Sequence, residues 1–339
     1  MRNVHIVGTG GTIASTTDPD TGAAVPALSA EDLREQVPGL DDLADIDVTE
    51  FAQVNSWDMT PALMVQLSTV VADLLDGDTH GVVITHGTDT MEETAFVLEL
   101  LLGARRRTVV LTGAMRNASQ DGPDGPRNLL AAARVASSPA CADLGSVVVL
   151  NGQIHAARYV TKTHTTALDT FRSPDTGPLG TVDDIGPLVR WRPALLPPIE
   201  VDRLRDVDEP AVSMPDVHLV TMAAGHDDLL LRAALDAGSS GVVIEASGSG
   251  NVVAQWQSAV RALIDANVPV VLASRCGSGR VVPGYGGDGG GHTLVELGVV
   301  PAGDLPGPKA RLALLLLLSG GADVAAVRRW FADLSSTPR

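Results

Sequence analysis

The segment Ile84–Glu93 reads ITHGTDTMEE and gathers hydroxyl groups, one carboxylate and a glycine within ten residues. Gly81–Ile84 before it is a short apolar, β-branched run, typical of a buried parallel strand. Met91–Leu102 behind it has apolar residues at helical spacing and two early glutamates, as in the first turn of a helix. Ligands of open parallel sheets bind at the carboxyl ends of strands, so Thr88 and Asp89 are placed where chemistry takes place.

These residues also have structural interpretations. Asp89 or Thr90 could cap the following helix by accepting hydrogen bonds from its unpaired amides. Lys162 lies among threonines and small residues with few acids nearby, and a lysine usually extends to solvent. Its functional alternative is a general base, since an ammonium near other dipoles or cations can lose its proton near neutral pH. The sequence leaves both pairs of alternatives open.

The elements that must position these groups are short apolar strands that alternate with helices. We expect strands at 4–7, 47–54, 81–84, 108–111 and 146–150, and helices at 31–37, 61–75, 91–102 and 124–135. This order predicts an α/β fold with a large parallel sheet and helices on both faces. The strand ends then offer small or hydroxylated residues to one rim, at Thr12, Ser56, Thr88 and Ala114. Helix capping alone does not explain such a convergence.

A second strand–helix alternation follows a hairpin expected around Asn151–Gly152 and an irregular, proline-rich stretch at 177–215. We expect a large N-terminal catalytic domain at 1–190, a linker at 191–215 and a small C-terminal α/β domain at 216–339. In the small domain we expect strands at 218–222, 241–245 and 269–273, and helices at 227–237, 254–266, 309–318 and 324–334. Its glycine-rich loop, Gly277–Gly291, contains one aromatic residue, Tyr285.

The glycine-rich turn Gly8–Thr12 follows the first strand and lets the backbone approach a ligand closely. A dinucleotide-binding fingerprint would need a third glycine where Ile13 stands, and no clear helix follows. The next stretch, Ser15–Ala30, is polar and contains prolines and a glycine. It is typical of a mobile loop or lid.

Composition narrows the classes of partner. The chain has 339 residues, and its 24 basic against 41 acidic residues give a net charge of −17, which disfavours nucleic acid and anionic membranes. The start shows no secretory signal, and the longest apolar run, Leu312–Leu318, is too short to cross a bilayer. Neither the two cysteines, Cys141 and Cys276, nor the eight histidines have metal-ligand spacing. We expect a cytoplasmic protein without a metal.

Several motifs together resemble the bacterial L-asparaginase (asparaginase–glutaminase) family. The two long ones are VGTGGTIAS at 7–15 and THGTDTMEETA at 85–95, in the order and near the separation expected of that family. Three shorter ones are TGAM at 112–115, DGPxNL at 124–129 and VTKT at 160–163. The similarity extends over nearly the whole chain, including the two-domain plan.

The resemblance implies hydrolysis of L-asparagine to L-aspartate and ammonia, without metal or organic cofactor. A threonine hydroxyl attacks the side-chain amide, ammonia leaves, and water releases the acyl-enzyme. By motif match Thr12 would be the primary nucleophile. Thr88, Lys162 and Asp89 would form a second triad, in which Lys162 draws a proton from Thr88 and Asp89 orients the lysine or holds the substrate ammonium.

The same resemblance implies how the substrate is held. Ser56 and Asp89 would bind its α-carboxylate and α-amino groups, together with main-chain amides near Gly87 and Thr88. The Ala114 carbonyl would accept from the substrate amide, and main-chain donors around Gly11 and Thr88 would stabilise the oxyanion. Family members are tetramers built as pairs of dimers, in which each active site lies between the large domain of one subunit and the small domain of its neighbour.

Two positions depart from the family pattern. Family members carry in the lid a tyrosine that activates the first threonine, whereas Ser15–Ala30 has none. Tyr285 could substitute for it from the small-domain loop of a partner subunit, or could simply pack. Trp57 stands where relatives that accept glutamine often have a polar residue. We expect its indole to leave less room for one more methylene, so that asparagine is preferred about ten- to a hundredfold.

Two rival functions remain at this level. One is the asparaginase-like subunit of a tRNA-dependent amidotransferase, which usually brings an extra amino-terminal domain and a charge suited to RNA. The other is a catalytically silent amino-acid-binding protein. The presence of Thr12, Thr88, Asp89 and Lys162 disfavours the second, because binding alone needs no paired threonine and lysine.

Overall fold

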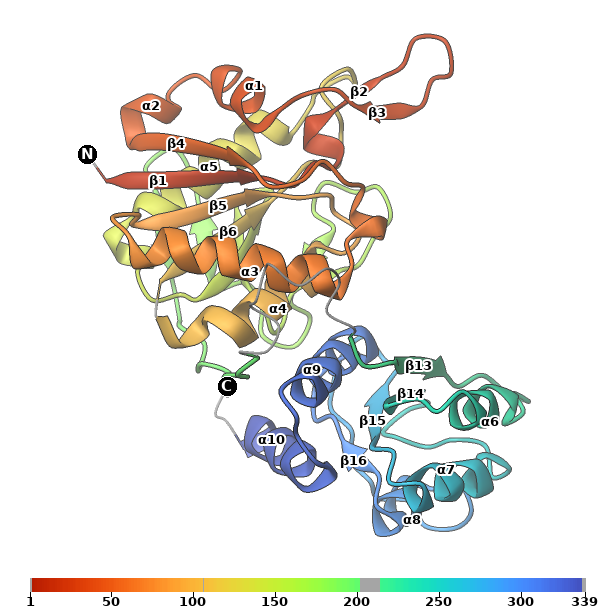
Figure 1. The fold of residues 1–339 in the computed structure, drawn as a ribbon. Coiled ribbons are helices and arrows are strands. Elements are labelled where there is room, and N and C mark those ends of the chain that lie inside the picture. Colours follow the sequence, from red (N-terminus) through yellow and green to blue (C-terminus); the bar gives the residue numbers. More distant parts are fainter. Residues whose placement is uncertain (1, 106, 202–213, 337–339) are drawn as a thin grey trace. The chain divides into compact units, whose positions relative to one another are not determined.

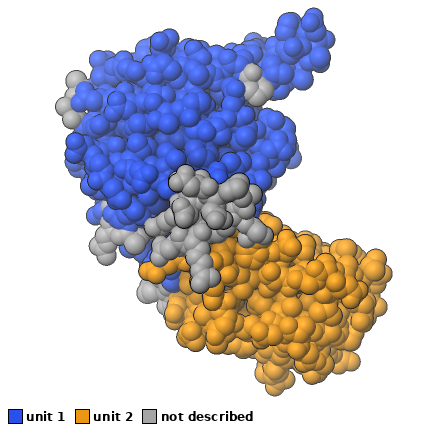
Figure 2. Space-filling view, viewed as in Figure 1, with its two compact units in different colours: residues 1–198 blue, residues 199–339 orange. Residues whose placement is uncertain are grey.

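The computed structural model describes residues 2–105, 107–201 and 214–336. They form two compact units, Met1–Pro198 and Ile199–Arg339, shown in blue and orange in Figure 2. Of the linker expected at 191–215, residues 202–213 lie outside the described part.

The first unit is built on an eight-stranded sheet in the order β12-β11-β8-β7-β6-β5-β1-β4 (Figure 1). The strands from β4 to β7 in that order are parallel, and β8, β11 and β12 extend the sheet with antiparallel pairs. Every residue of β5, β6 and β7 is buried, because helices cover both faces. The strands are β1 (Asn3–Gly8), β4 (Asp45–Glu50), β5 (Gly81–Thr85), β6 (Thr108–Thr112), β7 (Ser146–Leu150), β8 (Gln153–Ala156), β11 (Gly180–Val182) and β12 (Pro187–Val189).

Helices pack on the two faces of this sheet, as predicted. In Figure 1, α3 and α4 lie in front of the sheet and α5 lies behind it. The α5 face holds an apolar core cluster, to which the strands β1, β5, β6 and β7 contribute together with α1 and α2. The helices are α1 (Ala30–Glu35), α2 (Leu40–Leu43), α3 (Pro61–Asp76), α4 (Met91–Leu102) and α5 (Gly125–Ser137).

The hairpin predicted around Asn151–Gly152 is confirmed. It joins β7 to β8, and both turn residues have positive φ, 49° and 71°, as a two-residue turn between twisted strands requires. The strands β11 and β12 were not predicted. Each has only three residues, in a stretch rich in proline, glycine and aspartate that gives no clear alternation.

The stretch Ser15–Ala30, expected as an irregular loop or lid, contains a hairpin of β2 (Ser15–Thr17) and β3 (Ala24–Pro26). Asp18 closes the turn, since its carboxylate accepts hydrogen bonds from the Asp20 and Thr21 amides at 3.0 and 2.8 Å. These bonds, led by those from Thr21, lower the pKa of Asp18. The hairpin was not predicted from the sequence because each of its strands has only three residues, too few to show a periodic pattern.

The second unit has a four-stranded parallel sheet in the order β13-β14-β15-β16. In Figure 1, α6, α7 and α8 lie on one side of this sheet, where they enclose a core around Trp256, and α9 and α10 lie on the other. The predicted strands and helices are present; α8 and the two-residue β16 were not predicted, since α8 begins within the glycine-rich loop. The elements are β13 (Val217–Thr221), α6 (Leu229–Asp236), β14 (Gly241–Ala246), α7 (Trp256–Asp265), β15 (Val270–Ser274), α8 (Gly291–Leu297), β16 (Val300–Pro301), α9 (Gly307–Ser319) and α10 (Val324–Ser336).

No helix in the described part of the chain is long and apolar enough to span a bilayer.

Candidate active site

Four loops follow the carboxyl ends of neighbouring strands in the large sheet. The strands β6, β5, β1 and β4 are adjacent and parallel, with Thr112, Thr85, Gly8 and Glu50 in register at their carboxyl ends. The loops that follow these ends carry the four rim residues singled out in the sequence, namely Ala114, Thr88, Thr12 and Ser56. The order of the strands in the sheet therefore places residues from four distant segments at one rim.

Lys162 lies in the short strand β9 (Thr161–Lys162) and reaches the loop after β5. Its Nζ is 2.8 Å from the Thr88 hydroxyl oxygen and 2.6 Å from Asp89 Oδ1. The Lys162 side chain is only 16% exposed, so the interpretation in which it extends to solvent is wrong. An amine hydrogen-bonded to a hydroxyl and oriented by a carboxylate is the geometry of a nucleophile paired with its base.

The capping interpretation of this loop is also wrong. Thr90 occupies the N-cap position of α4, but its side chain makes no capping hydrogen bond. Its hydroxyl donates instead to the Ser56 carbonyl at 2.6 Å, and the Asp89 amide donates to the Ser56 hydroxyl at 3.2 Å. The polar side chains at the start of α4 thus serve to join the β4 and β5 loops, while Asp89 binds Lys162.

The loop after β1 lies against the same segment. Gly11, with φ 88°, approaches Gly87 so closely that an added β-carbon would lie 2.3 Å from the Gly87 nitrogen. Thr12 is the next residue and begins the short 3-10 helix η1 (Thr12–Ala14). Ser15 donates its hydroxyl to the Gly11 carbonyl at 2.9 Å. Glycine at both contact positions is what allows the loops of Thr12 and Thr88 to touch.

His86 precedes Thr88 by two residues in the same loop and is fully buried. Burial lowers the pKa of His86 to about 4, against an opposing effect of the Gly87 carbonyl, so the ring is neutral at pH 7. The Gly87 carbonyl, 2.7 Å from Nδ1, can only accept, which places the proton on Nδ1; Nε2 then accepts from the Thr94 hydroxyl at 2.9 Å. His86 supports the loop and does not supply a charge.

Two side chains brace the loop after β6, and neither was assigned an individual role from the sequence. The Asp124 carboxylate accepts from the amides of Met115 and Arg116 at 2.8–3.1 Å. Asn128, buried one turn later in α5, donates to the Gly113 carbonyl and accepts from the Asn151 amide, both at 3.0 Å. The signal for them was the DGPxNL motif, noted above only as part of the resemblance.

A third brace is Glu92, in the first turn of α4. Its carboxylate accepts from the main-chain amide of Lys162 and, at 3.1 Å, from the Thr161 hydroxyl. From the sequence, Glu92 was expected to contribute only as an acid at a helix start, because its partner lies 70 positions away.

The remaining predicted residues differ in their surroundings. Ala114 is buried, and its neighbour Gly113 packs near the Thr88 methyl group. Trp57 follows Ser56 in the short helix η2 (Ser56–Asp58), and its side chain is 68% exposed. Tyr285 belongs to the second unit, where it is 66% exposed in the loop before α8. The contacts within the first unit thus join the segments around Gly11, Ser56, Thr88 and Lys162.

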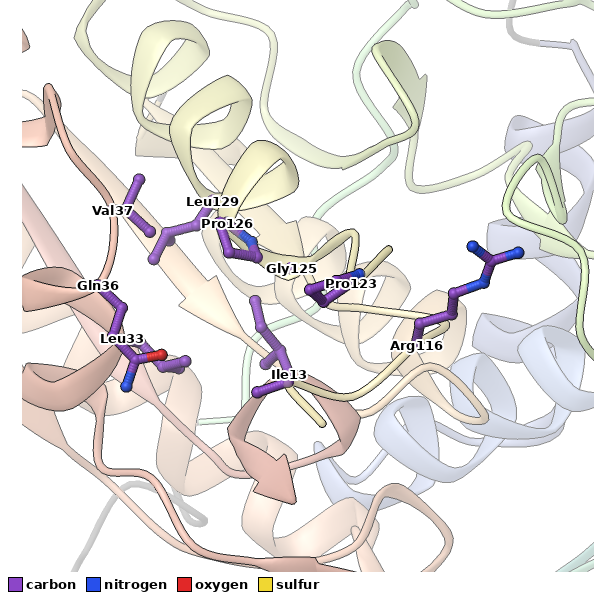
Figure 3. Close-up of a pocket in the computed structure, with 10 residues that line it drawn as sticks. Ile13, Leu33, Gln36, Val37, Arg116, Pro123, Gly125, Pro126 and Leu129 are labelled. Atoms are coloured by element: carbon purple, nitrogen blue, oxygen red, sulfur yellow. The ribbon is translucent and has the colours of Figure 1, made fainter. Parts of the chain in front are cut away.

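A cavity of about 100 Å³ lies beside η1, between α1 and the start of α5 (Figure 3). Its lining is mostly apolar and includes Ile13, Leu33, Val37 and Leu129. Ile13 also contacts Gly125, where an added β-carbon would lie 2.9 Å from its side chain. The residue after Thr12 is therefore seated in apolar surroundings, while the hydroxyl and amine groups described above lie outside this cavity's lining.

Among the described residues, no group of three or more histidine, cysteine, aspartate or glutamate side chains is arranged to hold a metal ion.

Comparison with known proteins agrees with the geometry. Residues 3–195 match the family model described as "Asparaginase, N-terminal", and residues 216–331 match the "Glutaminase/Asparaginase C-terminal domain". The probable L-asparaginase of Deinococcus radiodurans is 41% identical, with 98% of each chain covered. The crystal structure of a probable cytoplasmic L-asparaginase from Campylobacter jejuni is similar with a TM-score of 0.86 at 31% identity, covering 98% of this chain and 99% of that one.

A relative of different function is also similar. A subunit of the glutamyl-tRNA(Gln) amidotransferase of Methanopyrus kandleri is 34% identical, and the match covers 97% of this chain but 73% of that protein.

Proposed function

The chain belongs to the asparaginase family, and from this premise we propose that it hydrolyses L-asparagine to L-aspartate and ammonia through a threonine acyl-enzyme. The observation that supports the proposal most is the contact of Lys162 Nζ with the Thr88 hydroxyl and the Asp89 carboxylate. A binding protein would have no need of an amine held against a hydroxyl.

In the proposed reaction, the Thr12 hydroxyl oxygen attacks the side-chain amide carbon of the substrate. The activating base takes the hydroxyl proton and passes it to the amide nitrogen, the carbon–nitrogen bond breaks, and the nitrogen leaves as ammonia. Water then attacks the acyl ester, which releases L-aspartate and restores the threonine. Thr88, Lys162 and Asp89 form the second triad. In it Lys162 draws a proton from the Thr88 hydroxyl, and Asp89 orients the lysine.

The substrate would be held by groups whose loops are joined in the structure. We assign the α-carboxylate and α-amino group to Ser56 and Asp89, with the amides of Gly87 and Thr88. The Ala114 carbonyl accepts from the substrate amide. Main-chain N–H groups around Gly11 and Thr88 stabilise the oxyanion, at no cost of reorganisation during the reaction. The close approach of Gly11 to Gly87 supports this assignment, because it brings the two sets of donors together.

Further parts of the proposal concern the assembly. We propose a homotetramer, a dimer of dimers, in which Tyr285 of a neighbouring subunit activates Thr12 in place of a lid tyrosine. We also propose that the enzyme acts in the cytoplasm and needs no cofactor. Trp57 is assigned to selection of asparagine over glutamine.

The relationship to an amidotransferase subunit suggests a second function, amide hydrolysis coupled to a tRNA-bound substrate. The net charge of −17 disfavours it, since a surface so acidic repels a phosphate backbone.

The test is ammonia release from free L-asparagine by the purified protein and by Thr12→Ala and Thr88→Ala. We expect turnover by the wild type and its loss in each variant. Thr166→Ala, which changes an exposed threonine four residues after Lys162, is the control and should retain activity. A wild type inactive on free asparagine would contradict the proposal, and activity in one of the two variants would remove that threonine's assigned role.

A further inference from the structure

Lys162 is held at both ends by carboxylates from the same short segment. At the tip of its side chain, Nζ contacts Asp89 Oδ1 at 2.6 Å as well as the Thr88 hydroxyl. At its backbone, the amide donates to the Glu92 carboxylate, which also accepts from the Thr161 hydroxyl at 3.1 Å. Asp89 lies in the loop that leads into α4, and Glu92 lies in the first turn of that helix, so both carboxylates come from the same few residues.

The backbone of Lys162 has little other support from the sheets. The strand β9 has two residues and pairs with β10 (Phe171–Arg172), which also has two, outside the eight-stranded sheet. The Lys162 amide points away from β10 to Glu92, while the next amide, of Thr163, donates to the Thr170 carbonyl. A carboxylate that accepts from a main-chain amide forms a stronger bond than a neutral acceptor does.

An acid at a helix start is commonly explained by the helix dipole alone. That explanation applies equally to Glu92 and Glu93, which share the first turn of α4. It does not require a contact with a strand 70 positions away. The contact with Thr161 and Lys162 therefore gives Glu92 a role beyond the helix dipole.

We propose that Glu92 is a positioning residue for the reaction, acting through Lys162. By fixing the β9 backbone against α4, it sets the point from which the flexible lysine side chain reaches Thr88. The Thr88–Asp89 loop leads directly into α4. The positions of Lys162 and Thr88 are therefore both fixed relative to the same helix. This inference rests on the proposed function, since it assigns Lys162 as the base.

The role predicts a specific kinetic signature. Glu92 touches Lys162 and Thr161 and is assigned no contact with substrate, so its loss should lower kcat and leave KM within about twofold. We expect Glu92→Leu, which matches the size but cannot accept, to lower kcat about 10- to 100-fold. Glu92→Gln keeps one acceptor oxygen and should retain kcat within about fivefold. Glu35→Gln, which removes the same charge at an exposed position of α1, should stay near wild type.

The experiment measures kcat and KM for L-asparagine in the full-length wild type and these variants, with melting temperatures alongside. If Glu92→Leu does not fold, the pair Thr161→Val and Thr161→Ser decides, because only serine keeps the hydroxyl that Glu92 accepts from. We expect Val to lower kcat about threefold and Ser to retain it.

Several outcomes would overturn the inference. Unchanged kcat in Glu92→Leu would do so, as would equal losses in Glu92→Leu, Glu92→Gln and Glu35→Gln. Equal kcat in the two Thr161 variants would also overturn it. A change confined to KM would point to substrate binding and would contradict the positioning role. A wild type that releases no ammonia would contradict the proposed function, and the inference would fall with it.

Discussion

Gly11 and Gly87 lie in backbone contact, with space for no atom between them: a β-carbon on Gly11 would be 2.3 Å from the Gly87 nitrogen and 2.4 Å from its α-carbon. This contact joins the loop of Thr12 to the loop of Thr88. The two proposed nucleophiles are thereby held at one rim by main chain, which cannot give way as a flexible side chain would.

The first prediction follows from this contact. Gly11→Ala adds a β-carbon that must separate the two loops, at a φ of 88° that side chains rarely adopt. We expect loss of at least about 99% of asparaginase activity. Gly39→Ala is the matched control, since Gly39 has the same φ but no atom within 4 Å of the added carbon; it should cost about 1–2 kcal/mol of stability and leave activity intact. Ammonia release and urea unfolding measure both effects, and an active Gly11→Ala would refute the contact's role.

A second prediction concerns the brace of the β6 loop. Asp124→Ala leaves the Met115 and Arg116 amides without their acceptor, so we expect a loss of about 1–3 kcal/mol in the free energy of unfolding. We also expect lower kcat/KM, because this loop carries Ala114. Asp121→Ala removes the same charge from the same turn at an exposed position and should change neither quantity. Equal effects of the two substitutions would show that charge, and not the brace, matters.

The third prediction tests substrate choice. Trp57→Ala should raise kcat/KM for glutamine relative to asparagine about ten- to a hundredfold, because one methylene in a pocket is worth about 1–3 kcal/mol. Parallel assays of the two amides with wild type and variant give the ratio. Comparable turnover of both amides by the wild type would rule the assignment out, as would an unchanged ratio in the variant.

The fourth prediction concerns pH and a buried acid. Glu99 in α4 accepts from the Ser146 amide at 2.6 Å, and burial raises its pKa from 4.5 to about 7, with that hydrogen bond opposing the shift. Below pH 4.5 the carboxyl is protonated in both the folded and unfolded protein. As pH rises from 4.5 to 7, the unfolded chain releases the proton while the folded protein retains it, so Glu99 destabilises the fold increasingly, by about 3 kcal/mol at pH 7.

Glu99→Gln removes this titration and keeps an oxygen that can accept from Ser146. We expect the free energy of unfolding of the variant, minus that of wild type, to rise by about 3 kcal/mol between about pH 4.5 and 7.5 in urea titrations. The buried histidines His86 and His155, whose pKa values burial lowers to about 4, act in the opposite direction but cancel in this difference. A difference that is independent of pH would contradict the prediction.

The sequence by itself determined the α/β class, the parallel core of the large sheet and the position of its main helices. These follow from local patterns: β5 is five consecutive buried residues, and α4 begins at Met91 and ends at Leu102, as its apolar spacing predicts. The motifs also placed Thr88 and Asp89 in a loop at a strand end. Short strands such as β2 and β3 were not predicted, because three residues carry too little periodicity to distinguish a strand from a loop.

Only the tertiary structure decided what the polar side chains do. From the sequence, Asp89 or Thr90 could equally well be helix caps and Lys162 could extend to solvent, because capping and solvation need only local sequence. The structure excludes both by contacts between segments: Lys162 reaches Thr88 across 74 positions, and Thr90 donates to Ser56. The braces from Glu92 and Asn128 likewise depend on which loops the strand order brings together. Hydrogen bonds between distant segments leave no periodic pattern in the chain, and so they could be found only in three dimensions.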